Sequence, residues 1–508
     1  MKKNEGPRLS RAYLWLTTPR RDYALIDSVI VAYCGSVLLV QILLQISPFV
    51  TFLATTPFYS IQTYLGLLGG ALIVVDLFTT KRIWQGKYSL FLYGILALAA
   101  LASVRMISYG MKENIFKLCW MSIQFVLMYS CAYRRDRKTL IKYAKGLFYV
   151  LLLIWFVGCC VSLYQYVEQI GYMYVVNPLA MDSSSNRQGF YDNRLFGIFY
   201  TLNHAAYISL FFLVIAVVCT FREKSLWAKL GLLVAELALL CHIILSVSRS
   251  AMISMVICAA VLTWAMVRNA VKGHRPACVL IPLGAAVLAA VLCFTGYHVL
   301  KEGLARIPYL KSMVEYHQQA DDPTAPSDPL PEPDFDDELL DRENLESDVS
   351  NGRMSIWKDY VSLYQQIGII GLSPGNYMPY ILEDHPELYI VDYIRLNYPD
   401  KYESGIIHHV HSGYMMIYVS TGILGLLCLI GFMVLCVIRL LRTILRNKSL
   451  SYLYIGALAL VTSGAFAALT DEGLFFQNNP HTTMFWLALG ILMLDSLAPA
   501  TLPESSNE

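Results

Sequence analysis

Three closely spaced histidines stand just before a long apolar stretch, in the segment HHVHSGYMMIYVSTGILGL (408–426). A neutral imidazole can accept a proton near neutral pH, and it can also bind a metal ion. His408 and His411, three residues apart, would form a metal site if Asp471 and Glu472 joined them. The histidines alone leave both a catalytic base and a metal site open.

The composition is that of an integral membrane protein. Of the 508 residues, 56% are hydrophobic and 15% are charged, and the mean hydropathy is +0.50. A soluble core could not bury so much apolar surface. The 39 basic and 37 acidic residues give a formal charge of +2, so the net charge gives no indication of a nucleic-acid partner.

Apolar runs of roughly 17 to 25 residues, the length that crosses a bilayer, occur about twelve times along the chain. We therefore predict an all-α polytopic membrane protein with about 12 transmembrane helices and one large extracytoplasmic loop domain between the ninth and tenth spans. The predicted division is a cytoplasmic N-terminal tail (1–23), a membrane domain of about nine spans (24–300), the loop domain (301–410), a membrane domain with the last three spans (411–498) and a cytoplasmic C-terminal tail (499–508).

Lysine and arginine are concentrated in alternate loops, which predicts that both termini and the basic loops are cytoplasmic. Few cations then remain for the outer side, and those that do are unusual enough to suggest a role. They are Arg187, Arg194, Arg249 and Arg353.

The predicted loop domain changes character along its length. Residues 321–350 are acidic and proline-rich, which is typical of a flexible arm. Residues 353–366, RMSIWKDYVSLYQQ, have apolar residues at helical spacing, so we expect an amphipathic helix that lies against the membrane domain. The stretch GIIGLSPGNY (368–377) then predicts a turn.

Four stretches together resemble the O-antigen ligase and O-antigen polymerase (Wzy-type) family of bacterial membrane glycosyltransferases. In the last of them, His411 and Gly422 match the family's His-x10-Gly pattern. The sequence departs from the family at Ser412, where Asn is usual, at Ser373, where Gly is usual, and at His204, which follows Asn203. The four stretches are RLFGIFYTLNHAA (194–206), SVSRSAMIS (246–254), NGRMSIWKDYVSLYQQIGIIGLSPGNY (351–377) and the histidine segment (408–426).

The resemblance implies a GT-C-like membrane enzyme of cell-envelope polysaccharide biosynthesis, of lipopolysaccharide or capsule. Such an enzyme transfers a glycan from a polyprenyl (undecaprenyl) diphosphate carrier to a hydroxyl of a glycan or lipid acceptor. The transfer takes place at the outer face of the cytoplasmic membrane and needs no cofactor or metal. The resemblance does not distinguish a ligase from a polymerase.

The resemblance also implies residue roles. His411 would be the catalytic base, and Arg194, Arg249 and Arg353 would bind the diphosphate, because guanidinium groups form paired hydrogen bonds with phosphate oxygens. Eleven residues at about 100° each would place Gly422 on the same helical face as His411, about 16 Å deeper, where a glycine lets a neighbouring helix approach. Asn376, Tyr377, Asp471 and Glu472 are possible glycan contacts, whereas His408 and His409 are expected to be ordinary loop residues.

Other functions remain open at this point. A transporter or flippase of the same lipid-linked glycan would also have about twelve helices, but transporters usually show internal repeats and ionisable residues at the bilayer midplane. An envelope scaffold without chemistry would not need the three arginines and His411. The pair Asp334 and Asp336 spells the Asp-x-Asp pattern of many nucleotide-sugar transferases, although it lies in a run of acidic residues.

Overall fold

The computed structural model describes residues 24–175, 185–271, 275–320, 334, 339–340, 352–405, 407 and 409–494. The predicted N-terminal and C-terminal tails, nearly all of the acidic arm, Asp336 and His408 lie outside these residues. The chain divides into two compact units, which are described separately below. Unit 1 comprises Met1–Gln41, Ser60–Leu147 and Asp348–Glu508, and unit 2 comprises Ile42–Tyr59 and Phe148–Ser347.

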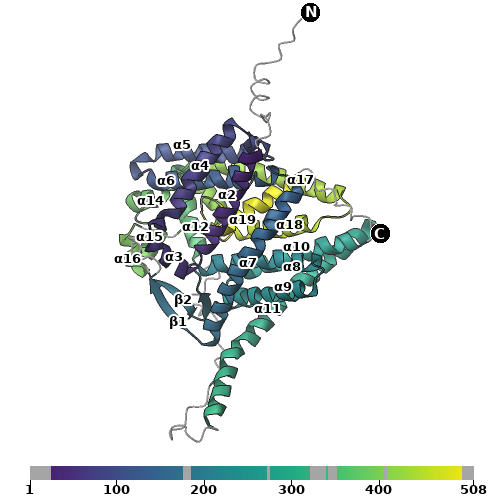
Figure 1. The fold of residues 1–508 in the computed structure, drawn as a ribbon. Coiled ribbons are helices and arrows are strands. Elements are labelled where there is room, and N and C mark those ends of the chain that lie inside the picture. The colour runs from purple at the N-terminus through teal and green to yellow at the C-terminus, as the bar shows by residue number, and fades with distance from the viewer. Residues whose placement is uncertain are drawn as a thin grey trace, which may run out of the picture. The chain divides into compact units, whose positions relative to one another are not determined.

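The structure is dominated by apolar helices, as predicted for a polytopic membrane protein (Figure 1). Among the described residues, nine helices are long and apolar enough to cross a membrane. The predicted spans near 88–107, 452–470 and 482–498 also form helices, but shorter ones. They are α5 (Ser89–Arg105), α18 (Tyr452–Ala467) and α19 (Pro480–Leu492). The total of about 12 spans therefore stays a prediction.

The long helices of unit 1 come from both ends of the chain. The longest, α17 (Gly413–Arg446), packs along α5. Serine or asparagine side chains cap α17, α18 and α19 by accepting a hydrogen bond from a first-turn amide, as helix starts require. The other long helices are α2 (Ala24–Leu43), α4 (Ile61–Phe78), α6 (Lys112–Ser122), which continues as a π-helix (Ile123–Met128), and α7 (Arg137–Val167), which runs on into unit 2.

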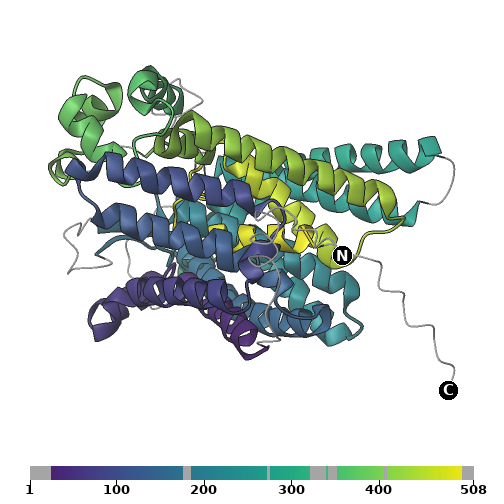
Figure 2. The ribbon, with the colours of Figure 1, turned by 90° about the horizontal axis from the view of Figure 1, so that it is seen from above.

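Residues 352–405 of unit 1 fold into short helices that gather at one end of α17, in green in Figure 2. The predicted amphipathic helix is present as α12 (Arg353–Ser362), and it packs against α15 through a hydrogen bond from the Ile390 amide to Asp359 (2.8 Å). The others are α13 (Tyr364–Ile367), α14 (Tyr377–Asp384), α15 (Tyr389–Asn397) and α16 (Pro399–Glu403).

Unit 2 consists of packed helices and a small antiparallel sheet that the sequence analysis did not predict. The helices are α3 (Ser47–Ala54), α8 (Leu202–Arg222), α9 (Leu226–Leu245), α10 (Arg249–Ala270) and α11 (Arg275–Ala320). The sheet has the order β1-β2-β3, formed by Gly171–Val175, Ser185–Tyr191 and Arg194–Gly197. Asp192 and Asn193, both with positive φ, make the tight turn between β2 and β3, as two-residue hairpins require.

Helix α11 continues to Ala320, past residue 300 where we predicted the start of the loop domain. An apolar cluster at this extension contains the buried side chains of Tyr166, Leu195, Leu245, Ala305 and Leu340. The Tyr166 hydroxyl also donates to the Leu304 carbonyl at 2.9 Å. The extension is therefore packed against α7, β3 and α9 of the same unit.

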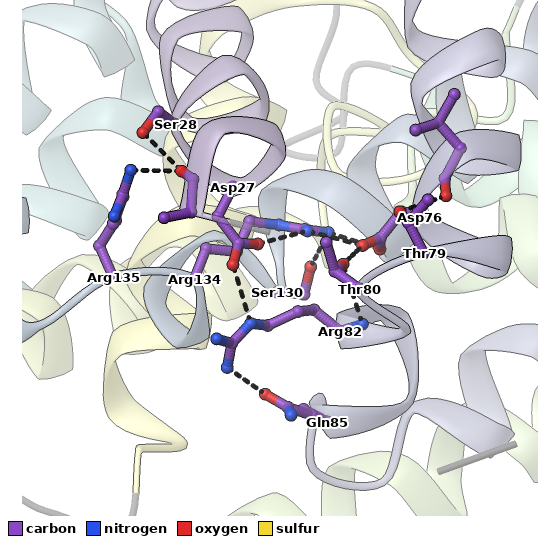
Figure 3. Close-up of polar contacts among 12 residues, drawn as sticks. Asp27, Ser28, Asp76, Thr79, Thr80, Arg82, Gln85, Ser130, Arg134 and Arg135 are labelled. Atoms are coloured by element: carbon purple, nitrogen blue, oxygen red, sulfur yellow. Dashed lines mark hydrogen bonds and ion pairs between the residues drawn. The ribbon is translucent and has the colours of Figure 1, made fainter. Parts of the chain in front are cut away.

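A buried ion network ties together four segments of unit 1 (Figure 3). The guanidinium of Arg134 binds both carboxylate oxygens of Asp76, at 3.0 and 2.8 Å, and neither side chain is exposed. Asp27 accepts from Arg134 at 3.4 Å and from Arg82 at 3.1 Å. The charges of two carboxylates and two guanidinium groups therefore neutralise each other. A charged group buried away from water requires such a partner.

Replacement of Asp76 by Asn should destabilise the protein by about 3–5 kcal/mol, because Arg134 would keep its charge but lose its main buried partner. Thermal unfolding of the detergent-solubilised protein measures this loss. The matched control is Arg135→Met, since Arg135 donates to the Ala24 carbonyl in an exposed contact. Equal stability of the two variants would contradict the buried role of the network.

Candidate active site

Helix α17 is broken at Gly422, where the backbone adopts φ 66° and ψ −165°. A break within an apolar helix exposes amide and carbonyl groups that must be satisfied where water is scarce. Here the chain around residues 368–373 supplies the partners, because its backbone lies along the break. The hydrogen bonds run from Leu372 N to Val419 O (2.7 Å), Ser373 N to Ser420 O (3.2 Å), Ile423 N to Gly368 O (3.2 Å) and Leu424 N to Ile369 O (3.3 Å).

Two glycines make this crossing possible. A Cβ on Gly422 would lie 2.4 Å from backbone atoms of Ile369, and a Cβ on Gly371 would lie 2.4 Å from the Ser420–Thr421 peptide. Both glycines also have positive φ, 66° and 96°. Each of the two crossing segments therefore needs a glycine at the point where the backbone of the other approaches.

The crossing corrects the predicted role of Gly422. We expected His411 and Gly422 to share one face of a continuous helix, with a second helix packed at the glycine. That expectation was wrong, because α17 begins at Gly413, after His411, and is interrupted at Gly422. The segment that approaches Gly422 is the 368–373 turn.

His411 lies in an extended segment directly before α17 and has a left-handed backbone, with φ 51°. Its neighbours on both sides are fixed. The Val410 carbonyl accepts a hydrogen bond from the Trp357 indole at 2.9 Å, and the Gly413 amide donates to the carbonyls of Ala468 (2.8 Å) and Asp471 (3.0 Å). His411 is half-buried, so part of it stays accessible while the backbone on both sides is fixed.

Arg353 is the first residue of α12 and follows Gly352, whose φ is 75°. Its side chain is half-buried and forms no ion pair with any residue that the structure describes. Trp357, one turn further along α12, makes the hydrogen bond to Val410 next to His411. The Trp357 indole therefore connects the arginine motif to the histidine motif.

Asn376 and Tyr377, two of the predicted glycan contacts, are 2% and 0% exposed. The Asn376 amide donates to the carbonyls of Met106 (2.6 Å) and Gly110 (2.9 Å), which attaches the 368–377 turn to the segment before α6. Burial, followed by the charge of Glu472, raises the pKa of the Tyr377 hydroxyl well above its ordinary value. We therefore propose that both residues support the turn rather than touch the glycan.

Asp471 and Glu472 lie in the connection between α18 and α19 and differ in their contacts. The Asp471 carboxylate accepts from the Gly473 amide at 2.9 Å, so it shapes its own turn. The Glu472 carboxylate pairs with Nδ1 of His409 at 3.0 Å. Within the part of the chain that the structure describes, no three His, Cys, Asp or Glu side chains are arranged to hold a metal, and the predicted ligand His408 is outside that part.

The other two predicted arginines both lie at the turn between α9 and α10 in unit 2. The Arg194 guanidinium, at the start of β3, donates to the Ser246 carbonyl at 3.1 Å. Arg249, three residues later in the same turn, is exposed and begins α10. Ser248 donates to the Asn203 side chain at 3.1 Å, which links the turn to α8. The structure thus brings together the motifs around residues 194–206 and 246–254.

The comparison with known protein families covers this region. Residues 233–430 match the sequence model of the O-antigen ligase family. This stretch of the chain is therefore similar to that family. The match includes Arg249, Arg353, His411 and Gly422 and leaves Arg194, Asp471 and Glu472 outside. No curated protein and no solved structure matches the chain.

The match confirms the resemblance drawn from the motifs, three of which lie within the matched residues. It identifies a multi-pass membrane protein with a ligase- or polymerase-type glycosyltransferase function in polysaccharide biosynthesis. Sequence reasoning missed one contact at the site, the pairing of His409 with Glu472. The two residues are far apart in the chain, and no spacing rule connects them.

Replacement of Gly422 by Ala should disrupt the crossing and strongly reduce activity. The backbone conformation is one that essentially only glycine adopts, at a cost of about 1–3 kcal/mol for other residues, and the new Cβ would overlap Ile369. Unfolding temperature and glycan product in cells measure the effect. Gly70→Ala in α4 is the control, because its Cβ would meet nothing within 4 Å; equal behaviour of both variants would contradict the crossing.

Proposed function

We propose that this protein transfers a glycan from a polyprenyl diphosphate carrier to an acceptor hydroxyl at the outer face of the cell membrane. The family match supports the reaction class, and it favours this enzyme over the lipid-linked glycan transporter that the helix count also allowed. The acceptor is a glycan or a lipid.

One observation carries the proposal. The Trp357 indole joins α12 to the histidine segment by its 2.9 Å hydrogen bond to the Val410 carbonyl. Arg353 is one turn before Trp357, and His411 directly follows Val410. A permanent cation and a titratable imidazole are therefore held by one rigid link, as a phosphate leaving group and an acceptor hydroxyl require.

Arg353 is well placed for an anion. It stands at the first position of a helix, where the backbone amides already favour negative charge. A cation at that end is unfavourable alone and becomes favourable when a phosphate neutralises it. We assign Arg194 and Arg249 the same phosphate-binding role at the turn before α10.

The proposed transfer forms one bond at the anomeric carbon and breaks one. The acceptor oxygen attacks the anomeric carbon, the bond from that carbon to the diphosphate oxygen breaks, and the diphosphate leaves with the electron pair. The proton of the acceptor hydroxyl passes to the neutral imidazole of His411, which later releases it to water. Arg353 stabilises the charge that develops on the leaving phosphate.

Replacement of His411 by Ala should stop glycan transfer while the protein remains folded in the membrane. A general base contributes about 10²–10⁴-fold, so the product should fall at least ~100-fold. The assay is the glycan profile on gels from cells whose only copy carries the substitution, with the protein quantified in the membrane fraction. A normal glycan profile would refute His411 as the base. Accumulation of the lipid-linked glycan in the cytoplasmic leaflet would indicate a transporter instead.

Arg353→Lys keeps the charge but cannot form two parallel hydrogen bonds with one phosphate. We expect transfer to fall about tenfold or more, because hydrogen bonds to charged groups contribute about 1.5–3 kcal/mol each. Lys358→Arg, further along the exposed side of α12, is the control and should retain activity. Wild-type turnover in Arg353→Lys would rule out paired phosphate contact at this residue.

A further inference from the structure

His409 and Glu472 form an ion pair that the proposed reaction has not used. Nδ1 of His409 lies 3.0 Å from Oε1 of Glu472. The Glu472 side chain is 13% exposed and the His409 side chain 45%. A carboxylate this deeply placed needs a compensating partner, and the imidazole supplies it from the more exposed side.

The chemistry of the pair fixes where the proton lies. A carboxylate only accepts, so Nδ1 of His409 must carry the hydrogen in this contact. The Tyr377 hydroxyl is 3.5 Å from the same nitrogen, and its raised pKa keeps it neutral. The bond to Glu472 is strongest when the imidazole is protonated, because both groups are then charged.

This pair and two other contacts help to attach the segment that carries His411. Trp357 binds the Val410 carbonyl, and the Gly413 amide binds the end of α18 through Ala468 and Asp471. Those two attachments use neutral groups that do not titrate near neutral pH. The His409–Glu472 contact alone among these three changes with protonation.

We propose that Glu472 is a positioning residue for catalysis, which anchors His409 and so holds His411 in its reactive position, and that this anchor makes transfer depend on the protonation of His409. The inference rests on the proposed function of His411. Two histidines two residues apart then have opposite requirements. His411 must be neutral to accept a proton, whereas His409 must be protonated to hold the segment firmly.

Other charged and titratable groups surround this anchor and shape its response. Glu472 acts electrostatically on the buried phenols of Tyr360 and Tyr377, and Asp359 also acts on Tyr360. Lys117 lies over the Tyr377 ring at 5.6 Å and pairs with Glu113 at 3.7 Å, so these two largely cancel. Among the described residues, the charged and titratable groups linked to Glu472 electrostatically or by sequence are on α6 (Glu113, Lys117), α12 (Asp359, Tyr360), α14 (Tyr377), the α18–α19 connection (Asp471) and the histidine segment (His411).

The test is the pH profile of transfer in open membranes prepared from the source cells, whose own lipid-linked glycan serves as the donor. The wild type should give a bell-shaped profile. Activity requires a neutral His411, which is lost at low pH, and a protonated His409, which is lost at high pH. Glu472→Gln should reduce kcat about tenfold at neutral pH, leave KM unchanged and remove the alkaline fall. Glu472→Asp keeps the charge and should retain the alkaline fall.

The matched control is Trp357→Phe, which removes a neutral attachment of the same segment. It should lower the rate at every pH without changing the shape of the profile. A Glu472→Gln enzyme with the wild-type profile, or one that loses rate equally at every pH, would overturn the anchor. If His411→Ala is inactive in the same membranes, such a result leaves the proposed function intact; an active His411→Ala enzyme would overturn both.

Discussion

The site in unit 1 depends on a backbone constraint, the crossing of the 368–373 turn with the break in α17. A helix in an apolar setting cannot be interrupted unless other groups satisfy the freed amides and carbonyls. The turn does this with four backbone hydrogen bonds, and it fits only because Gly371 and Gly422 lack side chains where the chains cross. The short helices that carry Arg353 are thereby joined to the helix that follows His411.

This constraint explains why the two halves of the His-x10-Gly pattern belong together although they do not share a helical face. His411 precedes the first turn of α17, and Gly422 accommodates the turn that leads into α14. The turn is in addition attached to the segment before α6 through Asn376. The crossing at Gly422 therefore fixes one end of the intervening half-helix, and the Gly413 amide fixes the end next to His411 through Ala468 and Asp471.

Much of the fold could be read from the sequence because the bilayer imposes a simple rule. Each predicted apolar run coincides with a helix, since a long apolar segment has few other ways to satisfy its backbone. The sheet of unit 2 was missed because its strands are only four to seven residues long, although Asp192 and Asn193 gave a hairpin signal. The break at Gly422 was missed because one glycine in an apolar helix normally costs about 1 kcal/mol and does not interrupt it.

The motifs identified Arg249, Arg353 and His411. The structure adds that both arginines stand at the start of a helix. Arg249 and Arg353 each begin a helix without a side-chain cap: Ser248 turns its hydroxyl to Asn203, and Gly352 has no side chain to offer. Helices α4, α8 and α15, which do not begin at an arginine, also lack a side-chain cap, so the missing cap is significant here only together with the arginine. An arginine at an uncapped helix start combines two positive features at a local cost in stability, and an anion bound there would offset that cost. The same arrangement occurs separately in each unit, at Arg249 and at Arg353.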